Sequence, residues 1–393
     1  MIMTTSFAFE NLTWPAVAAL PRHVPLVIPL GTGYDFSNLA SLVGDPQQIG
    51  LLPPIPFGWQ GSRLPVDEPL LANLLDNLLV SLAEDGFTQV FALVPPGLKL
   101  SLKNAGRLLE LTPQPAKVAT LPSGEDLDKV VLIPIGHTEQ HGFHLPLSTD
   151  TVIIEAIGQA VAAAIPTQAL SLPVMPYGVS THRASFAGTL NCGGRAFEDF
   201  WLGAIDTLSA MGFKKLYLIS GHGGNCSFLT NVVKYAGERH PELFCATAWL
   251  YLSGPQGQRA LEEHRRSALG GMGHACELET ALMLHLRPDL VDMQKAVDET
   301  NFITTPSYYM DWVEGGALIA NPPWEDDSQT GAYGAGSLAT AENGTIWLEA
   351  AVAEKAAHVA EIIEQHQRRS ARRQERRLFR NALGELPDFL ANL

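Results

Sequence analysis

Residues 133–150, with the sequence IPIGHTEQHGFHLPLSTD, bring together side chains that could perform acid–base or metal chemistry. Glu139 and His141 stand two positions apart, soon after an apolar run, and Asp150 ends the stretch. Residues two apart on an extended segment point the same way, so one carboxylate and one imidazole can face a common point. Taken alone, Asp150 could equally be the N-cap of the next helix.

Two later stretches add residues of the same chemical kind. His222 lies in SGHGGN, where the small neighbours let the backbone approach a ligand closely. Neither a P-loop lysine nor the Rossmann glycine spacing is present there. His274 and Glu277 lie in GHACELET, three positions apart, and would share one face of a helix. On that helix Glu279 points elsewhere and is expected to support its neighbours.

Oxygen and imidazole ligands that arrive from three strand ends suit a divalent metal ion. Three carboxylates and two ligand histidines could hold two ions, with one carboxylate bridging them. Such a pair can activate a water molecule and polarise a carbonyl group. Zinc, manganese and iron all accept these ligands, so the residue types do not select between them. The chain has no nucleophile elbow of the G-x-S-x-G type, and no cysteine stands out as a nucleophile.

The elements that must position these residues alternate between strands and helices. Apolar runs and helical spacing predict strands at 129–136, 169–178, 214–220 and 243–252, and helices at 150–166, 195–212, after the GHGGN loop and at 274–286. This alternation favours a mostly parallel sheet with helices on both faces, which is a three-layer α/β/α fold. In such sheets, sites form at the carboxyl ends of strands.

The first part of the chain echoes this pattern in a shortened form. Residues 24–31, 51–58 and 74–97 resemble, in the same order, residues 129–136, 170–178 and 201–224. Because three strand–helix units in matching order exceed what chance would give, we interpret the echo as an internal duplication with a degenerate first copy. The alternative is that apolar strands ending in glycine occur in any α/β chain.

The duplication predicts three parts of the chain. Residues 1–115 form a degenerate half without metal ligands, 125–365 form the catalytic domain, and 366–393 form a basic C-terminal helix or tail. The residues that the first half places against Glu139, His141 and His222 are Tyr34, Phe36 and Pro96. The basic tail predicts a solvated helix face or a salt-bridged contact between subunits.

Composition excludes several classes of protein. The 393 residues suggest two domains or one large α/β unit, and 46% hydrophobic residues indicate a globular protein. A net charge of −15 repels phosphate backbones, so no nucleic-acid partner is expected. The four cysteines lack CxxC spacing, the N-terminus lacks a basic signal region, and no apolar run reaches membrane-spanning length. We therefore expect a cytoplasmic protein without a membrane partner.

The three motif stretches resemble the signatures of the creatininase (creatinine amidohydrolase) family. The most specific match is Glu-x-His-Gly followed by His-Leu-Pro and then Asp, and the stretch LTWPAVAAL at 12–20 also resembles the opening of a family domain. The resemblance implies an α/β/α fold, a two-metal centre, a homo-oligomer and hydrolysis of a carbon–nitrogen amide bond in a small molecule. It matches Glu139, His141, Asp150 and His222 to metal ligands, Asp150 to the bridging carboxylate and His274 to a proton-moving histidine.

Two departures from the family pattern bear on the substrate. Gly224 stands where the creatinine-hydrolysing branch has a glutamate ligand, and Glu277 is our candidate for the lost carboxylate, both as ligand and as catalytic residue. Branches with GHGGN include enzymes that act on formamides and a peptidase that trims a peptide-derived cofactor. The stretch SFAGT, residues 185–189, replaces the usual Phe-Pro-Gly-Thr.

The sequence is therefore compatible with three functions. The leading one is a metal-dependent amidohydrolase that cleaves a cyclic amide or formamide with a metal-activated water. The others are a metallopeptidase-like or deformylase enzyme and a non-catalytic scaffold. The residues expected to bind substrate are His182, Gly223, Gly224 and Asn225. His137 and His144 are expected to support ligands or to stabilise the loop.

Overall fold

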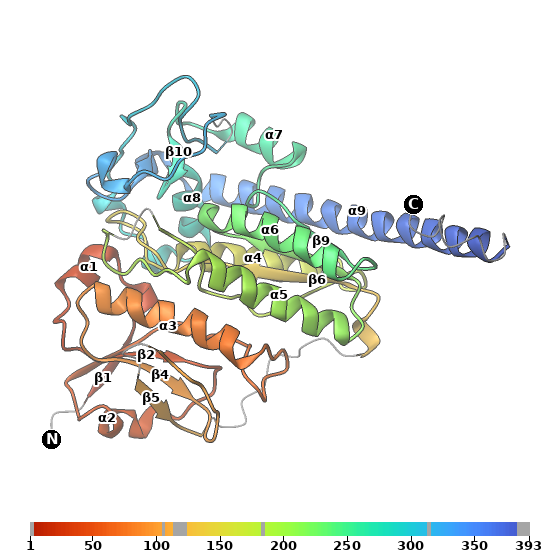
Figure 1. The fold of residues 1–393 in the computed structure, drawn as a ribbon. Helices are drawn as coiled ribbons and strands as arrows, with labels where there is room; N and C mark the ends of the chain where they lie inside the picture. Colours follow the sequence, from red (N-terminus) through yellow and green to blue (C-terminus); the bar gives the residue numbers. More distant parts are fainter. Residues whose placement is uncertain (1–3, 104–106, 113–123, 182–184, 313–315, 383–393) are drawn as a thin grey trace.

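The computed structural model describes residues 4–103, 107–112, 124–181, 185–312 and 316–382 (Figure 1). Their first part forms a parallel sheet in the order β1-β3-β2-β4-β5. These strands are β1 (Thr5–Ala8), β2 (Leu26–Pro29), β3 (Gln48–Leu51), β4 (Val90–Val94) and β5 (Arg107–Glu110). The short helices α1 (Trp14–Ala19) and α2 (Leu39–Leu42) and the long helix α3 (Glu68–Glu84) accompany this sheet.

A second parallel sheet lies above the first in Figure 1 and has the order β7-β6-β8-β9. Its strands are β6 (Val130–Ile135), β7 (Ala169–Ser171), β8 (Lys215–Ser220) and β9 (Phe244–Thr247). All residues of β6 and β8 are buried, as expected for parallel strands that are covered on both faces. A small antiparallel pair, β10 (Met272–His274) and β11 (Tyr333–Gly334), lies beyond this sheet.

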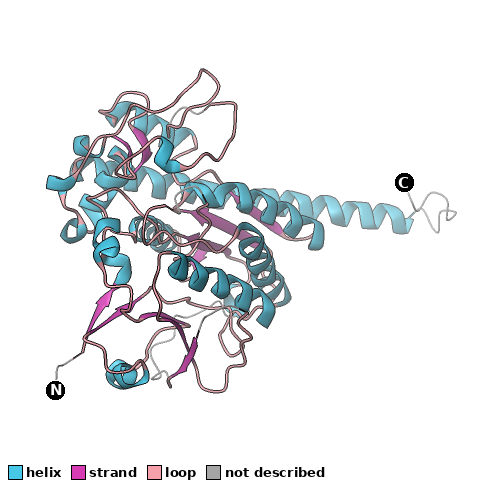
Figure 2. Ribbon diagram, turned by 60° about the vertical axis from the view of Figure 1, so that its left-hand side comes forward, coloured by secondary structure: helices cyan, strands magenta, loops and turns pink. Residues whose placement is uncertain are grey.

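Helices cover both faces of the second sheet. One layer contains α4 (Thr149–Ala164), α8 (Glu277–Leu286) and α9 (Ala341–Ala382), and the other contains α5 (Gly194–Ala210) and α6 (Gly223–Arg239). Alternate residues of β6 follow this division, since Val130 and Leu132 join the core beside α4 and α9, whereas Val131 and Ile133 join the core beside α5. The predicted three-layer α/β/α fold is therefore confirmed, and the secondary-structure view shows the strands enclosed by helices (Figure 2).

The two sheets share one apolar core. Helix α3 lies between the first sheet and α5, and residues of the first sheet, α3, α5 and the second sheet belong to a single buried cluster. At its centre Phe57 packs against Phe200 and Trp201 with ring-centroid distances of 6.4 and 6.1 Å. The range 1–115 therefore packs tightly on the range 125–365 within the described residues. The internal duplication itself stays a prediction.

Four element boundaries differ from the sequence-based expectation. The strand predicted at 169–178 ends at Ser171, shortly before Pro173, which has no N–H to donate to the sheet. The strand predicted at 243–252 ends at Thr247, because the chain turns at Leu250, whose φ is 46°. The helix predicted from His274 begins at Glu277, because His274 ends β10 and Ala275 has a φ of 48°. The GHGGN loop is shorter than expected, since α6 begins at Gly223.

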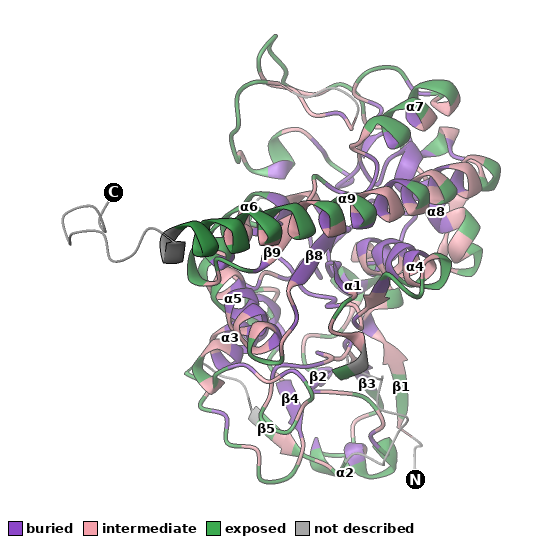
Figure 3. Cartoon of the chain, turned by 90° about the vertical axis from the view of Figure 1, so that its right-hand side faces the viewer, coloured by how far each residue is buried: buried purple, intermediate pink, exposed green. Residues whose placement is uncertain are grey.

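Helix α9 is 42 residues long, and its C-terminal part projects beyond the body of the protein (Figures 1 and 3). The helical course predicted for the basic cluster is observed as far as Ala382, and residues 383–393 lie outside the described part. Most residues of the projecting part are exposed. Helix α7 (Pro255–His264) packs on the other end of α9, and short 3-10 turns occur at Phe9–Asn11, Phe36–Asn38, Gly124–Asp126, Pro288–Leu290, Met293–Lys295, Trp324–Asp326 and Gly336–Leu338. Among the helices described, none combines the length and apolarity needed to cross a bilayer.

Candidate metal centre

The candidate residues meet at the carboxyl edge of the second sheet. Glu139 and His141 follow β6, His222 follows β8, and Asp150 lies in the first turn of α4. His274 is the last residue of β10, so the small antiparallel pair brings it to the same edge. Within the described chain, seven buried residues form three groups whose ligand atoms are close enough to share an ion. They are His137, Glu139, His141, Asp150, His222, His274 and Glu279.

Asp150 lies between two sets of possible ligands. Its Oδ1 is 3.1 Å from Nε2 of His141, and its Oδ2 is 3.3 Å from Nδ1 of His222. On the His222 side, Glu139 Oε1 is 3.1 Å from the same Nδ1. On the His141 side, Glu279 Oε1 is 4.0 Å from Nε2. Each oxygen of Asp150 therefore faces a different imidazole–carboxylate pair, which is the arrangement of a bridging carboxylate.

Backbone carbonyls fix the tautomers of three imidazoles. His141 donates from Nδ1 to the Glu139 carbonyl at 3.1 Å, His222 from Nε2 to the Val179 carbonyl at 2.9 Å, and His274 from Nε2 to the Gln140 carbonyl at 2.7 Å. A carbonyl can only accept, so the bonded nitrogen carries the hydrogen. In each neutral ring the other nitrogen keeps its lone pair and faces the carboxylates, as metal ligation requires.

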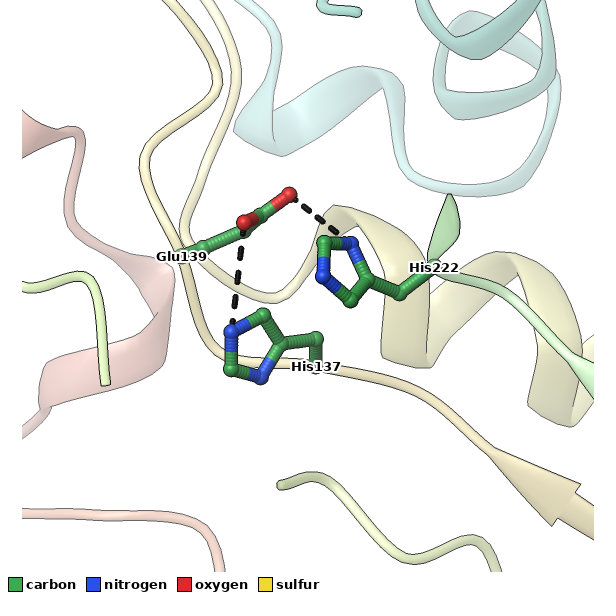
Figure 4. A group of neighbouring side chains, drawn as sticks. All are labelled: His137, Glu139 and His222. Atoms are coloured by element: carbon green, nitrogen blue, oxygen red, sulfur yellow. Dashed lines mark ion pairs between the residues drawn. The ribbon is translucent and has the colours of Figure 1, made fainter. Parts of the chain in front are cut away.

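His137 and His144 have different roles from these three. The Gly178 backbone N–H donates to Nδ1 of His137 at 2.9 Å, so the hydrogen of the neutral ring is on Nε2, which faces Glu139 Oε2 at 3.9 Å (Figure 4). His137 thus faces the second oxygen of the Glu139 carboxylate, and its ring lies beside that of His222 at a centroid distance of 4.5 Å. His144 forms a 2.8 Å hydrogen bond with the Thr280 hydroxyl, and burial lowers its pKa to about 4. It stabilises the loop against α8.

The electrostatics of the cluster suit a cation. Burial alone lowers the pKa of His141, but the charges of Asp150, Glu279 and Glu139 outweigh this and raise it to about 9. The pKa of His222 rises to about 9 in the same way, through Glu139 and Asp150. Burial raises the pKa of Asp150, but its two imidazole neighbours reverse the effect and hold it below the usual value. Buried carboxylates that attract protons onto imidazoles would bind a divalent ion by the same attraction.

Glu277 does not lie where we expected it. Its carboxylate accepts hydrogen bonds from the backbone N–H groups of Arg266 and Ser267, at 3.0 and 2.7 Å. Because α8 begins only after the kink at Ala275, Glu279 reaches the cluster instead. The expected ligand and catalytic role of Glu277 is thus corrected: it secures the loop before β10, and Glu279 supplies the carboxylate beside His141.

The expected substrate-binding residues divide into two groups. Gly223 and Gly224 line a cavity at the site, in the first turn of α6. Asn225 is fully buried behind them, where its amide bonds the backbone of Val179 and Gly136, so its expected contact with substrate is corrected to a structural role. His182 lies outside the described residues.

Gly224 is explained by the close approach of two polar groups. A Cβ at this position would lie 2.4 Å from both Nε2 of His222 and the Val179 carbonyl oxygen, which are hydrogen-bonded to each other. Any side chain here would therefore displace the bond that orients His222. The glutamate found at this place in the creatinine-hydrolysing branch does not fit the present arrangement.

A cavity of about 360 Å³ opens onto His222, His274 and Glu279. Six aromatic side chains contribute to its wall, namely Trp249, Tyr308, Tyr309, Trp312, Trp324 and Tyr333. The ring of Trp324 meets His274 edge-on at a centroid distance of 5.7 Å. Sequence reasoning missed this wall because the segment between α8 and α9 has no periodic pattern. The aromatic-rich stretch SYYMDW was the available signal.

The sheet and its buried carboxylate–imidazole cluster define an α/β protein with a candidate two-ion centre. Comparison with known families agrees with this class. The family model described as "Creatininase: Creatinine amidohydrolase" matches residues 117–359. The chain therefore belongs to the creatininase family.

Individual relatives carry different names. A mycofactocin precursor peptide peptidase of Mycobacterium ulcerans (strain Agy99) is 36% identical over 168 residues, which are 41% of this chain and 60% of that protein. A creatinine amidohydrolase of Pseudomonas putida is 30% identical over 184 residues, 44% of this chain and 69% of that protein. The solved structure titled "Creatininase Mn" is 24% identical, with a TM-score of 0.50, and covers 60% of this chain and 91% of its own. The chain thus spans about 60% of the length of the first of these relatives.

Proposed function

We propose that the protein is a metal-dependent amidohydrolase that cleaves a carbon–nitrogen amide bond in a cyclic amide or a formamide. The observation that carries this proposal is the position of Asp150, whose two oxygens face His141 and His222 separately. One ion would be held by Glu139, Asp150 and His222, and a second by His141, Asp150 and Glu279. When bound, such ions lower the pKa of a water molecule and polarise a carbonyl oxygen.

The remaining chemistry falls to side chains of this chain. His274 has its Nε2 hydrogen committed to the Gln140 carbonyl, and its Nδ1 lies 3.6 Å from Glu139 Oε1. This nitrogen faces the site and can take up a proton and deliver it to the leaving nitrogen. Trp324, packed edge-on against the ring, limits its rotation. The aromatic side chains in the cavity wall would reduce the contact of a bound substrate with water.

A second function, removal of a residue from a small peptide or cofactor precursor, has two observations in its favour. The relative from Mycobacterium ulcerans is named as a peptide peptidase. The cavity of about 360 Å³ has room for a group larger than a small ring, and its aromatic wall would bury apolar side chains. The substrate distinguishes the two: a cyclic amide or formamide for the amidohydrolase, and a linear peptide for the peptidase.

The metal content of the purified protein tests both enzymatic proposals against a scaffold. We expect about two equivalents of zinc, manganese or iron in the wild type and loss of both in the double variant Glu139→Ala/His141→Ala. The matched control is Tyr34→Phe, at the equivalent corner of the first sheet, which should keep the metal. A wild type that holds no metal and takes up none when it is added back would overturn the proposal and favour a scaffold.

We also propose that the protein is a homo-oligomer and that its only other partner is the amide substrate. The projecting end of α9, which carries paired arginines on an exposed helix, is a candidate contact between subunits. Light scattering on the full chain and on a variant that ends at residue 365 tests this. An unchanged molar mass per particle, after correction for the missing residues, would count against a subunit contact by the arm.

A further inference from the structure

We call residues 1–115 the first unit and residues 125–365 the second unit. A loop of the second unit, residues 186–193, is hydrogen-bonded to three residues on or directly after α3 of the first unit. The Gly188 N–H donates to Asp85 Oδ2 at 2.7 Å, and the Asn191 N–H donates to the Ser81 hydroxyl at 3.1 Å. The Ser81 hydroxyl also donates to the Asn191 carbonyl at 3.5 Å, and the Asn77 amide donates to the Cys192 carbonyl at 2.6 Å. The three residues of the first unit stand four apart on or directly after α3, so they form one polar edge of that helix.

The other side of the same loop contacts the segment that carries the ligands. The Gln140 N–H donates to the Thr189 hydroxyl at 3.1 Å, and the Leu190 N–H donates to the Thr138 carbonyl at 3.0 Å. Thr138 and Gln140 are the two neighbours of Glu139 in the chain. The backbone of the loop therefore lies directly between α3 and the segment that carries Glu139, a candidate metal ligand.

The carbonyls of this segment in turn orient two imidazoles. The Glu139 carbonyl accepts from His141, and the Gln140 carbonyl accepts from His274. A displacement of the 138–140 backbone would move the Glu139 carboxylate and both ring orientations together. Fixing this backbone thus fixes three of the groups on which the proposed chemistry depends.

The loop includes two left-handed glycines, Gly188, which bonds Asp85, and Gly193, which lies against the Asn77 amide. Gly188 has a φ of 85°, and a Cβ there would meet Leu147 at 2.8 Å; Gly193 has a φ of 73°, and a Cβ there would meet the Asn77 amide at 2.6 Å. Glycine is the residue least restricted by its own side chain. Neighbours therefore help to fix the conformation at these points: Asp85 and Leu147 at Gly188, and Asn77 together with Asn191 of the loop itself at Gly193.

A second tether from the first unit reaches the helix that carries Asp150. The Leu147 N–H donates to the Leu12 carbonyl and the Ser148 N–H to the Glu10 carbonyl, both at 2.9 Å. Trp14 donates from its indole to the Thr330 carbonyl at 2.7 Å and packs on Phe186 at 5.3 Å. The opening segment of the chain thus contacts both loops that flank the cluster.

We infer that the first unit, which has none of the ligand residues, acts as a positioning scaffold for the metal centre of the second. Its working part is the polar edge Asn77, Ser81 and Asp85, which holds loop 186–193 against the backbone of residues 138–140. This inference rests on the proposed function, since it assigns these residues an effect on metal binding. They are positioning residues, because they act through the loop and touch no reacting group.

The variants Asp85→Ala and Asp85→Asn test the inference. Alanine leaves the Gly188 N–H without its acceptor, whereas the oxygen of asparagine can still accept. We expect Zn²⁺ affinity to fall roughly tenfold in Asp85→Ala, the scale on which supports behind a metal ligand act, and to recover in Asp85→Asn. Asn73→Ala is the matched control, because Asn73 is on the same helix and bonds only Lys103 in the hydrogen bonds described.

Hydrogen exchange provides a readout that does not require an active enzyme. In Asp85→Ala, amide exchange should accelerate in residues 137–141 as well as in the loop, and it should be unchanged there in Asn73→Ala. Faster exchange confined to the loop, with wild-type Zn²⁺ affinity, would overturn the inference. Ser81→Ala, which removes a smaller support, gives the same readouts if Asp85→Ala does not fold. If the wild type binds no Zn²⁺, the proposed function fails, and exchange at residues 137–141 alone decides the positioning role.

Discussion

Apart from the additional edge strand β1 of the first sheet, the two sheets of this protein have matching strand orders but different residues at their carboxyl edges. The order β3-β2-β4-β5 of the first corresponds position by position to β7-β6-β8-β9 of the second. After β6 the chain presents Glu139 and His141, whereas after β2 it presents Tyr34, which is buried and bonds the Leu30 carbonyl at 2.6 Å. A parallel sheet requires only apolar strands, and the few residues beyond their ends decide whether it can hold a metal ion.

The comparison also concerns what the first unit, which lacks the candidate ligands of the second, can contribute to it. Two features separate the first unit from a free-standing domain: its core is continuous with that of the second, and its helix α3 fastens a loop behind the ligands. If the chemistry resides in the second unit and the first unit supports it, substitutions in the second unit should have the larger effects.

Replacing Asp150 by Asn should have the largest effect. The amide would lose the charge and one of the two acceptor oxygens that face His141 and His222, so both candidate ions should bind weakly. We expect hydrolytic activity to fall by roughly a thousandfold or more, as for a central catalytic group in other hydrolases. Atomic-emission analysis measures the expected loss of metal, and an assay of amide hydrolysis measures the loss of activity. Tyr34→Phe is the control variant in the first unit. Full metal content in Asp150→Asn would remove the bridging role.

Gly224→Ala should have the next largest effect, and Gly223→Ala is its matched control. A methyl group at 224 would displace the bond from His222 to the Val179 carbonyl, while one at 223 has only Trp249 near it, at 3.8 Å. We expect metal affinity to fall roughly tenfold to a hundredfold in the first variant, because a ligand loses its orientation. The second should bind metal like the wild type. Equal effects in both would show that helix α6, and not His222, is sensitive to the added methyl.

Glu279→Gln and Glu277→Gln should separate binding from stability. The first should lose metal affinity with little change in the melting temperature. The second should keep its metal but lose roughly 1–3 kcal/mol of unfolding free energy, because its carboxylate accepts charge-assisted bonds from the backbone of Arg266 and Ser267. Isothermal titration with Zn²⁺ and thermal melts measure the two quantities. The reverse pattern would restore Glu277 as the ligand.

These two glutamates also show how far the sequence could lead. The strand–loop positions of Glu139, His141 and His222 were predictable, because each follows an apolar strand that marks its place. Glu279 was not, because helical spacing was counted from His274, while the helix starts three residues later, after the left-handed Ala275. Backbone conformation at one residue thus shifts the candidate ligand by two positions, about half a turn of the helix.

Other features had no local pattern from which to predict them. The bonds from α3 to loop 186–193 join residues more than 100 positions apart and involve Asn, Ser and Asp, which are common on any helix surface. The aromatic wall of the cavity lies in a segment without strand or helix periodicity. The bonds and the aromatic wall are formed by residues that lie far apart in the chain or in irregular segments. The sequence patterns predicted the elements of each unit but not how the two units pack against each other.

The smallest expected effect concerns Asp85, whose pKa differs in direction from that of Asp150. Burial raises the pKa of Asp85 to about 6, and the Gly188 N–H and Arg22 oppose this only in part. Because the folded state holds the proton more tightly than the unfolded chain, the free energy of unfolding should fall as the pH rises from about 4 through about 6. Asp85→Asn keeps the acceptor for Gly188 but cannot ionise, so its free energy of unfolding should not show this fall. Any excess of the wild-type free energy of unfolding over that of the variant should therefore shrink or reverse between pH 4 and about pH 6. Urea melts at pH 4, 5, 6 and 7 measure it, and parallel curves for the two proteins would show that Asp85 ionises at its ordinary pKa. That outcome would mean that this support of the loop is open to water, and the first unit would then hold the site less rigidly than its hydrogen bonds indicate.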